Sequence, residues 1–216
     1  MRFHSLPRVP HLPSSRRGND DLEVPESELP LFFASPVVIV EKLDGVGLTV
    51  ALDPGGGVDV DMKREWREAL DGRILRAARR WVRVHEDLLE PLVRDGSHLY
   101  GEWLLHRLVL RYDSLPAALV FHGIRDRRGR QQPRDEGNAR VKERGLAVVE
   151  PHFRGVIGQQ SLGSLVKNPS QFSRGRAEGI IVEAIDRQGA RWAKWVSRRY
   201  RQPKGREIEL RTNTIR

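Results

Sequence analysis

A lysine at the end of an apolar stretch is the first residue whose surroundings suggest chemistry. Lys42 follows the apolar residues 37–40 and stands two positions before Asp44 and three before Gly45. A lysine at a strand end can be partly desolvated, which lowers its pKa and frees a lone pair for attack. Asp44 would project to the same side and orient the amine or a metal ion, while Gly45 would let the backbone approach a phosphate. These few residues also fit an exposed hairpin turn, so alone they leave both interpretations open.

Three more charged residues interrupt apolar segments further along the chain. Glu102 lies within the apolar residues 99–104, and Glu178 directly precedes a run of apolar residues at 180–182. Lys194 interrupts the aromatic segment 191–196. A carboxylate is expensive to bury unless it binds something. Two acids and two lysines on interior strands therefore predict a site where the acids hold hydroxyls and a metal while the lysines engage phosphates.

The elements that must position these residues follow from hydrophobic spacing. Apolar residues at three- and four-residue intervals predict a helix over 65–93, and residues 134–145 form a second predicted helix. The aromatic stripe of the first helix is interpreted as core rather than as a platform for bases. The predicted strands cover residues 37–42, 48–52, 58–62, 97–105, 117–124, 146–153, 179–185 and 191–196. This order is typical of an α+β fold with mainly antiparallel sheets flanked by helices.

Composition excludes several classes of site. The 216 residues contain no cysteine, which excludes disulfides, zinc sites with thiolate ligands and cysteine nucleophiles. No apolar run approaches the roughly 20 residues that span a bilayer, so we expect a cytoplasmic protein that does not enter membranes. The histidines show no spacing typical of metal ligands and are interpreted as loop or surface residues: 85, 98, 106, 122 and 152.

The positive charge is concentrated at the C-terminal end. Residues 191–216 contain nine Lys or Arg and two acids, so they carry +7 of the formal +9. Such a segment can gather polyanions near a site, or it can be a solvated tail.

With these residues in place, the sequence resembles the covalent nucleotidyltransferases, the superfamily of DNA ligases, RNA ligases and mRNA capping enzymes. The first family motif is matched by Lys42, Asp44 and Gly45, and the later ones by Gly101-Glu102, Glu178-Gly179 and Lys194, in the family's order. The resemblance covers about residues 37–200. It implies the nucleotidyltransferase (ATP-grasp-like DNA/RNA ligase) fold.

Within the superfamily, three segments resemble compact bacterial and phage RNA ligases: residues 10–21, 112–116 and 145–155. Gly47 stands where DNA ligases commonly carry an arginine, and the 22 residues after Lys194 leave no room for an oligonucleotide-binding barrel. We therefore expect an ATP-dependent RNA ligase. A minimal DNA ligase or other nucleotidyltransferase, and a degenerate nucleic-acid-binding relative without activity, are the alternatives.

The resemblance also implies roles for individual residues. Lys42 attacks the α-phosphorus of ATP to form lysyl-AMP, Asp44 and Lys194 complete the catalytic set, and Glu178 binds Mg²⁺ or Mn²⁺. The AMP then passes to a 5′-phosphate, and a 3′-hydroxyl attacks. The residues expected to contact the nucleotide are Glu41, Lys42, Gly45, Glu102, Phe121, Ile180 and Lys194.

One departure concerns the strand that follows Gly101-Glu102. Leu119 occupies the position where the family stacks an aromatic residue on adenine, and Gly123 replaces an Asp. Phe121 shares the strand face of Leu119 and is expected to substitute.

The remaining expectations concern substrate and organisation. Lys63, Arg64, Arg198 and Arg199 are expected to bind nucleic acid, which is RNA, or alternatively DNA, with 5′-phosphate and 3′-hydroxyl ends. Residues 1–36 form an extended lead-in within the same domain, residues 37–200 the catalytic domain, and residues 201–216 a basic extension. The protein is expected to be a monomer.

Overall fold

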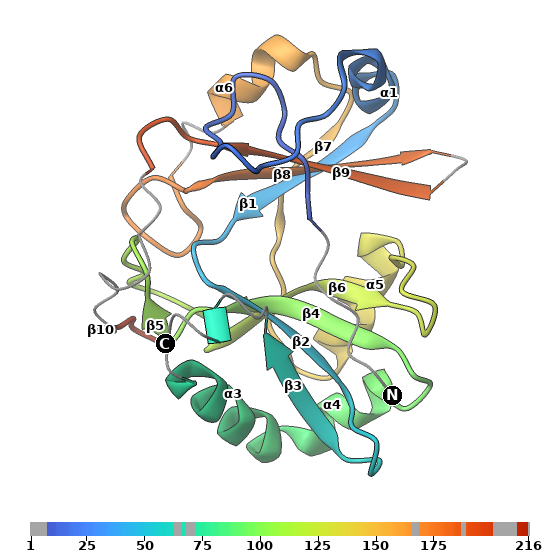
Figure 1. Ribbon diagram of the computed structural model, residues 1–216, viewed down its shortest axis with the longest axis vertical. Coiled ribbons are helices and arrows are strands. Elements are labelled where there is room, and N and C mark those ends of the chain that lie inside the picture. The colour runs from blue at the N-terminus through green and yellow to red at the C-terminus, as the bar shows by residue number, and fades with distance from the viewer. Residues whose placement is uncertain are drawn as a thin grey trace.

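The computed structural model describes residues 8–62, 66–67, 72–165, 169–186, 189–200 and 211–215, and two four-stranded sheets organise them (Figure 1). The Lys42 sheet has the order β7 (Pro151–Gly155), β1 (Val37–Lys42), β8 (Gly179–Asp186), β9 (Gly189–Val196). The Glu102 sheet has the order β3 (Val58–Met62), β2 (Val46–Leu52), β4 (His98–Trp103), β6 (Leu119–Arg125). Neighbouring strands in both sheets are antiparallel, so the predicted α+β class is confirmed.

The chain passes from one sheet to the other directly after Lys42. Gly45 lies in the crossing between β1 and β2, where a Cβ atom would lie 2.7 Å from Leu104 Cδ2 and 2.9 Å from the Trp103 carbonyl oxygen. Real Cβ atoms do not approach other atoms so closely. Glycine is therefore required here because the crossing chain packs against the end of β4, which places Lys42 at the junction of the sheets.

Helices cover the outer faces of both sheets (Figure 1). On the Glu102 sheet, α3 (Arg73–Val84) packs on β3, with Ile74 and Val82 in the buried core, and α4 (Glu86–Val93) packs on β2, β3 and β4. The predicted continuous helix is interrupted at His85, whose φ of −110° and ψ of 16° are not helical. The beginning of that predicted helix falls partly outside the described residues. Alongside β6 lies α5 (Arg134–Glu143).

The outer face of the Lys42 sheet carries shorter elements. These are η1 (Glu26–Glu28), α1 (Leu29–Phe33), η2 (Gln159–Ser161) and α6 (Leu162–Leu165). Phe32 and Leu162 pack there with Ile39 and Val182 of the sheet. A small two-stranded sheet pairs β5 (His106–Arg107) with β10 (Arg211–Thr212). None of the helices in the described residues combines the length and apolar character needed to cross a membrane.

The predicted lead-in runs along the edge of β9 that does not pair with β8. The Leu12 N–H donates to the Lys194 carbonyl at 2.8 Å, and the Lys194 N–H donates to the Pro10 carbonyl at 2.8 Å. Further along, the Arg16 N–H donates to the Val196 carbonyl at 3.0 Å. The lead-in therefore extends the Lys42 sheet at the strand that carries Lys194.

A buried ion pair joins the two sheets from the inside. Arg134 Nε donates to Glu183 Oε2 of the Lys42 sheet at 2.7 Å, and Arg134 Nη1 donates to the His122 carbonyl of the Glu102 sheet at 3.0 Å. The two charged side chains are 1% and 0% exposed. The guanidinium therefore bridges the two sheets that carry Lys42 and Glu102.

Replacing Arg134 with methionine is expected to lower the free energy of unfolding by about 3–5 kcal/mol, because Glu183 would lose its partner while staying buried. Urea unfolding followed by circular dichroism measures this change. The double variant Arg134→Met/Glu183→Met should recover most of the loss, since it removes both charges. An unaltered unfolding midpoint in the single variant would contradict the bridging role.

Candidate active site

Lys42 and Glu178 form an ion pair at the junction of the sheets. The register of β1 with β8 sets Lys42 opposite Gly179, which brings the neighbouring Glu178 alongside. The Lys42 Nζ atom lies 2.6 Å from Glu178 Oε1, and the two side chains are 24% and 6% exposed. Burial alone would lower the pKa of Lys42, but the nearby carboxylates of Glu178, Glu102 and Asp44 outweigh it and raise this pKa above its ordinary value.

Glycine is required next to each of the two glutamates because a larger residue would not fit there. A Cβ at Gly179 would collide with the Trp195 carbonyl on β9, and a Cβ at Gly101 would collide with the Val120 carbonyl on β6. Both glycines thus allow neighbouring strands to approach closely where a carboxylate stands beside them. The Glu178-Gly179 and Gly101-Glu102 pairs combine a charged group with the tight pairing that positions it.

Asp44 has a different position from the one expected. Its Oδ2 accepts the backbone N–H groups of Val109 and Leu110 at 2.8 and 2.5 Å, and its Oδ1 accepts the Tyr200 hydroxyl at 2.6 Å. The backbone N–H of Asp44 donates to the Tyr112 hydroxyl at 2.7 Å. Burial raises the pKa of Tyr200 well above its ordinary value, so this hydroxyl keeps its proton and donates it. Asp44 therefore holds the surrounding loops and acts on Lys42 through its charge.

Glu102 lies on the inner face of the other sheet, where its charge acts on the Lys42 amine. Its Oε1 atom lies 3.9 Å from Nε2 of His122, which is 5% exposed on β6. The Tyr100 and His122 rings are stacked, with their centroids 6.2 Å apart. The strand pairing skips His122, since Gly101 pairs with Phe121 and Tyr100 pairs with Gly123. Phe121 packs on the outer face, so His122 follows on the inner face by ordinary strand alternation, where sequence phasing had not placed an imidazole.

Lys194 meets residues of the lead-in that the sequence analysis did not select as site residues. Its Nζ atom lies 3.7 Å from Asp21 Oδ1, and Asp21 Oδ2 lies 3.4 Å from Nε2 of His11. His11 is buried, and its Nδ1 lies 2.7 Å from the Ser15 hydroxyl. The resemblance of residues 10–21 to RNA ligase lead-ins was the only sequence signal for this cluster.

Phe121 and Ile180 lie on the outer faces of their sheets, away from Lys42 and Glu178. Phe121 is fully buried beneath the Glu102 sheet, together with core residues of α3 and α5. Ile180 belongs to the core on the outer face of the Lys42 sheet, whereas Ile181 packs between the sheets. Alternation along a strand assigned residues to a common face correctly. Both faces are covered, however, so alternation could not tell which face carries the Lys42–Glu178 pair.

The remaining predicted residues surround this cluster or lie outside it. The Glu41 side chain is fully buried and its Oε2 accepts the Gln171 N–H at 2.7 Å, so it holds a loop. Arg198 and Arg199 are exposed in the turn after β9. Lys63 and Arg64 lie outside the described residues. The histidines at 98 and 122 are buried in strands rather than at the surface, because backbone pairing places them inside the sheet.

Buried histidines make stability depend on pH. Burial, helped by Lys194, lowers the pKa of His11 to about 4, and burial, helped by Arg134 and Lys42, lowers the pKa of His122 to about 3. The ordinary value is 6.5, so below this pH the unfolded chain binds more protons than the folded chain. The free energy of unfolding is therefore expected to fall as the pH drops from about 6.5 to about 4. Urea unfolding over a pH series measures this slope, and it should be shallower in His122→Gln.

The donor set suits a divalent cation that is shared with a nucleotide. Among the described residues, no group of three or more His, Asp or Glu side chains could hold a metal ion by themselves. Mg²⁺ and similar ions are commonly bound by one or two carboxylates together with substrate phosphates and water. Glu178 offers such a carboxylate beside Lys42. The residues present therefore fit a cation that arrives with phosphates.

Comparisons with known proteins agree with this geometry. A family model described as RNA ligase matches residues 35–196. Comparison with curated proteins found no match. A Naegleria gruberi RNA ligase with PPi has a TM-score of 0.62 at 15% identity, over 91% of this chain and 61% of that chain. An archaeal ATP-dependent RNA ligase has a TM-score of 0.55 at 17% identity, over 89% and 48%.

A mutant of the Naegleria gruberi RNA ligase with AMP and Mn has a TM-score of 0.54 at 13% identity, over 86% of this chain and 59% of that chain. At these identities the likeness shows the fold, which confirms the predicted architecture. The alignments take in less than two thirds of each of these structures, between 48% and 61% of their length. The family model spans most of this chain, from residue 35 to residue 196, and includes Lys42, Glu178 and Lys194; the chain therefore belongs to the RNA ligase family.

Proposed function

We propose that this protein is an ATP-dependent RNA ligase that works through a covalent lysyl-AMP intermediate. One observation carries the proposal: the Lys42 amine lies 2.6 Å from Glu178 at the junction of the two sheets. Glu102 on the opposite sheet acts on the same amine through its charge. Membership of the RNA ligase family supports this assignment.

In the first step, the Lys42 amine attacks the α-phosphorus of ATP. A phosphorus–nitrogen bond forms, the bond from the α-phosphorus to the pyrophosphate oxygen breaks, and the amine loses a proton. Because nearby carboxylates raise the pKa of Lys42, the amine must be relieved of its proton before it can attack. Lys194, in the strand beside β8, is suited to neutralise charge on the α-phosphate as it develops.

ATP and a divalent cation are the proposed cofactors, with Glu178 as the metal ligand. A related structure contains AMP and Mn, and another contains PPi, the nucleotide and leaving-group parts of such a reaction. The cation would withdraw charge from the phosphates. Mg²⁺ and Mn²⁺ are both compatible with an oxygen ligand of this kind.

In the later steps, AMP passes from Lys42 to an RNA 5′-phosphate, and a 3′-hydroxyl displaces it. The exposed Arg198 and Arg199 follow the strand that carries Lys194, and we propose that they contact the RNA phosphates. We further propose that residues 37–200 form the catalytic domain, that the lead-in of residues 1–36 completes its Lys194 edge, and that the protein acts as a monomer.

Incubation with α-labelled ATP and Mg²⁺ or Mn²⁺ tests the first step. The proposal expects an acid-labile label on the protein, as a phosphoramidate gives, and no label from γ-labelled ATP. Nicked RNA duplexes, nicked DNA duplexes and single-stranded RNA, each with 5′-phosphate and 3′-hydroxyl ends, then test the substrate. Sealing of DNA alone would favour the minimal DNA ligase, and RNA binding without labelling would favour a binding protein without activity.

A further inference from the structure

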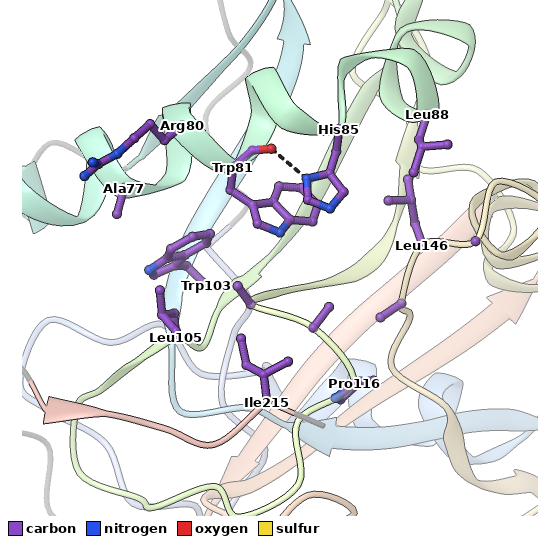
Figure 2. A pocket seen from close by; sticks show the side chains of 14 residues that line it. Ala77, Arg80, Trp81, His85, Leu88, Trp103, Leu105, Pro116, Leu146 and Ile215 are labelled. Carbon is purple, nitrogen blue, oxygen red and sulfur yellow. Dashed lines mark hydrogen bonds between the residues drawn. The ribbon is translucent and has the colours of Figure 1, made fainter.

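A groove of about 620 Å³ opens on the outer face of the Glu102 sheet (Figure 2). Arg80, Trp81 and His85 border it on one side, and Trp103 and Leu146 lie opposite. Neighbouring residues of β4 point to opposite faces of the sheet, so Trp103 lies on the groove side and Glu102 on the inner side. The groove is therefore separate from the candidate active site.

The groove presents an ordered aromatic surface. The Trp81 and His85 rings stack with centroids 3.9 Å apart and planes inclined by 18°. His85 Nδ1 lies 2.7 Å from the Trp81 carbonyl oxygen, which fixes this imidazole at the helix end (Figure 2). Trp103 Nε1 donates to His106 Nδ1 at 2.9 Å, so its polar group is already satisfied. Trp81 remains partly exposed, and a planar apolar group could stack against this surface without disturbing polar contacts.

Exposed arginines line the helix beside this surface. α3 contains five arginines and no acidic residue in its twelve positions, and all five arginines are exposed. Arg76, Arg80 and Arg83 follow one another at intervals of four and three residues, which places them in one row along the helix. Arg80 also lines the groove. Arg79 points elsewhere, since it pairs with Asp59 at 3.1 Å.

A row of cations next to an ordered aromatic surface has the charge and shape that bind single-stranded nucleic acid. The cations follow the phosphates, while bases stack on aromatic side chains without regard to sequence. α3 offers only positive charge, while in the following α4 Glu86 accepts the Val58 N–H and Glu90 pairs with Arg94, so the row beside the groove favours a polyanion.

We propose that α3 and this groove bind a single-stranded stretch of RNA outside the candidate active site. Arg76, Arg80 and Arg83 contact its phosphates, and one base stacks on the Trp81–His85 pair. This inference rests on the proposed RNA ligase function and adds a second contact, which holds the substrate strand away from its reacting ends. The stripe packs on the core as predicted, and the partly exposed Trp81 would in addition stack a base.

The test uses the full chain with a fluorescein-labelled single-stranded RNA, and measures binding by anisotropy over a range of salt concentrations. Arg76→Ala/Arg80→Ala/Arg83→Ala is expected to weaken binding at least tenfold and to reduce the slope of log K against log salt by about 2–3, about one for each lost phosphate contact. Trp81→Leu is expected to weaken binding roughly five- to hundredfold through lost stacking, with little change in the salt slope.

The matched control is Arg127→Ala/Arg128→Ala/Arg130→Ala, which removes the same charge from the turn after β6. It should bind RNA nearly as well as the wild type. Equal losses in the control and the α3 variant, or no loss in either, would overturn the proposal and leave α3 as a surface for another kind of partner. Should Trp81→Leu fail to fold, the arginine variants still decide, because their side chains are exposed.

Labelling of Lys42 by ATP without RNA separates this inference from the proposed function. The α3 variant is expected to take up AMP at the wild-type rate. If the wild type takes up no AMP, the proposed function fails whatever the RNA binding. If it takes up AMP and the α3 variant binds RNA normally, only the second contact fails.

Discussion

Replacing Lys42 with alanine is expected to abolish covalent labelling by α-labelled ATP, a loss of several orders of magnitude to background. The variant lacks the nitrogen that forms the bond to phosphorus and that lies 2.6 Å from Glu178 in the wild type. Gel electrophoresis of the labelled protein measures the effect. Folding should survive, because the unpaired Glu178 can take up a proton when its cationic partner is lost.

Lys42→Arg sharpens this test. The guanidinium keeps the positive charge beside Glu178 but stays protonated at accessible pH, so it cannot act as a nucleophile. It should therefore be as inactive as the alanine variant while retaining the stability of the wild type. Lys142→Ala provides a matched control, since Lys142 pairs with Glu150 at the same 2.6 Å on the surface and should label normally. Persistent labelling of Lys42→Ala would mean that another residue carries AMP.

Replacing Glu178 with glutamine is expected to slow labelling by roughly a hundred- to a thousandfold. The amide keeps the size of the side chain but removes the charge next to the Lys42 amine and the carboxylate proposed to hold the cation. Rates of labelling at several Mn²⁺ concentrations measure the change, and a raised Mn²⁺ requirement is the expected signature of a lost ligand. Glu150→Gln, which alters the matched surface pair, should behave like the wild type.

The pH profile separates the two roles of Glu178. Its carboxylate raises the pKa of Lys42, so Glu178→Gln should lower that pKa and make the free amine available at lower pH. If Glu178 served only to hold the lysine charge, the rate would be retained and its profile would shift to lower pH. A loss of rate at every pH instead indicates that the carboxylate acts on the metal or on the transition state. Wild-type labelling rates in Glu178→Gln at every pH would contradict both roles.

Local sequence was sufficient to locate several elements. The strands at 37–42 and 58–62 begin and end where predicted, because a β-branched apolar run and an apolar–polar alternation each specify a strand directly. The helix predicted from residue 134 begins there and ends two residues before Gly145. The break at His85 was missed, since apolar spacing continues across it while the backbone leaves the helix. The strand predicted over 146–153 begins only at Pro151.

The sequence did not show which face of each strand borders the candidate active site. Phe121 and Leu119 share a face as predicted, yet that face packs on helices, and His122 lies on the inner face beside Glu102 instead. Ile180 and Ile181 are equally apolar. Only the packing of the second sheet shows that Ile181 lies between the sheets. A strand covered on both sides carries no polar face to mark the site.

Local sequence was enough to select the charged residues of the candidate site, because Lys42, Glu102, Glu178 and Lys194 interrupt apolar segments where an unpaired charge would be costly to bury. Tertiary structure decided how they meet. The pairing of Lys42 with Glu178 comes from the register of β1 and β8, and the neighbours of Asp44 and Lys194 come from Tyr200 and from the lead-in. Such contacts join residues far apart in the chain, and hydrophobic spacing within one segment carries no information about which distant segment it pairs with.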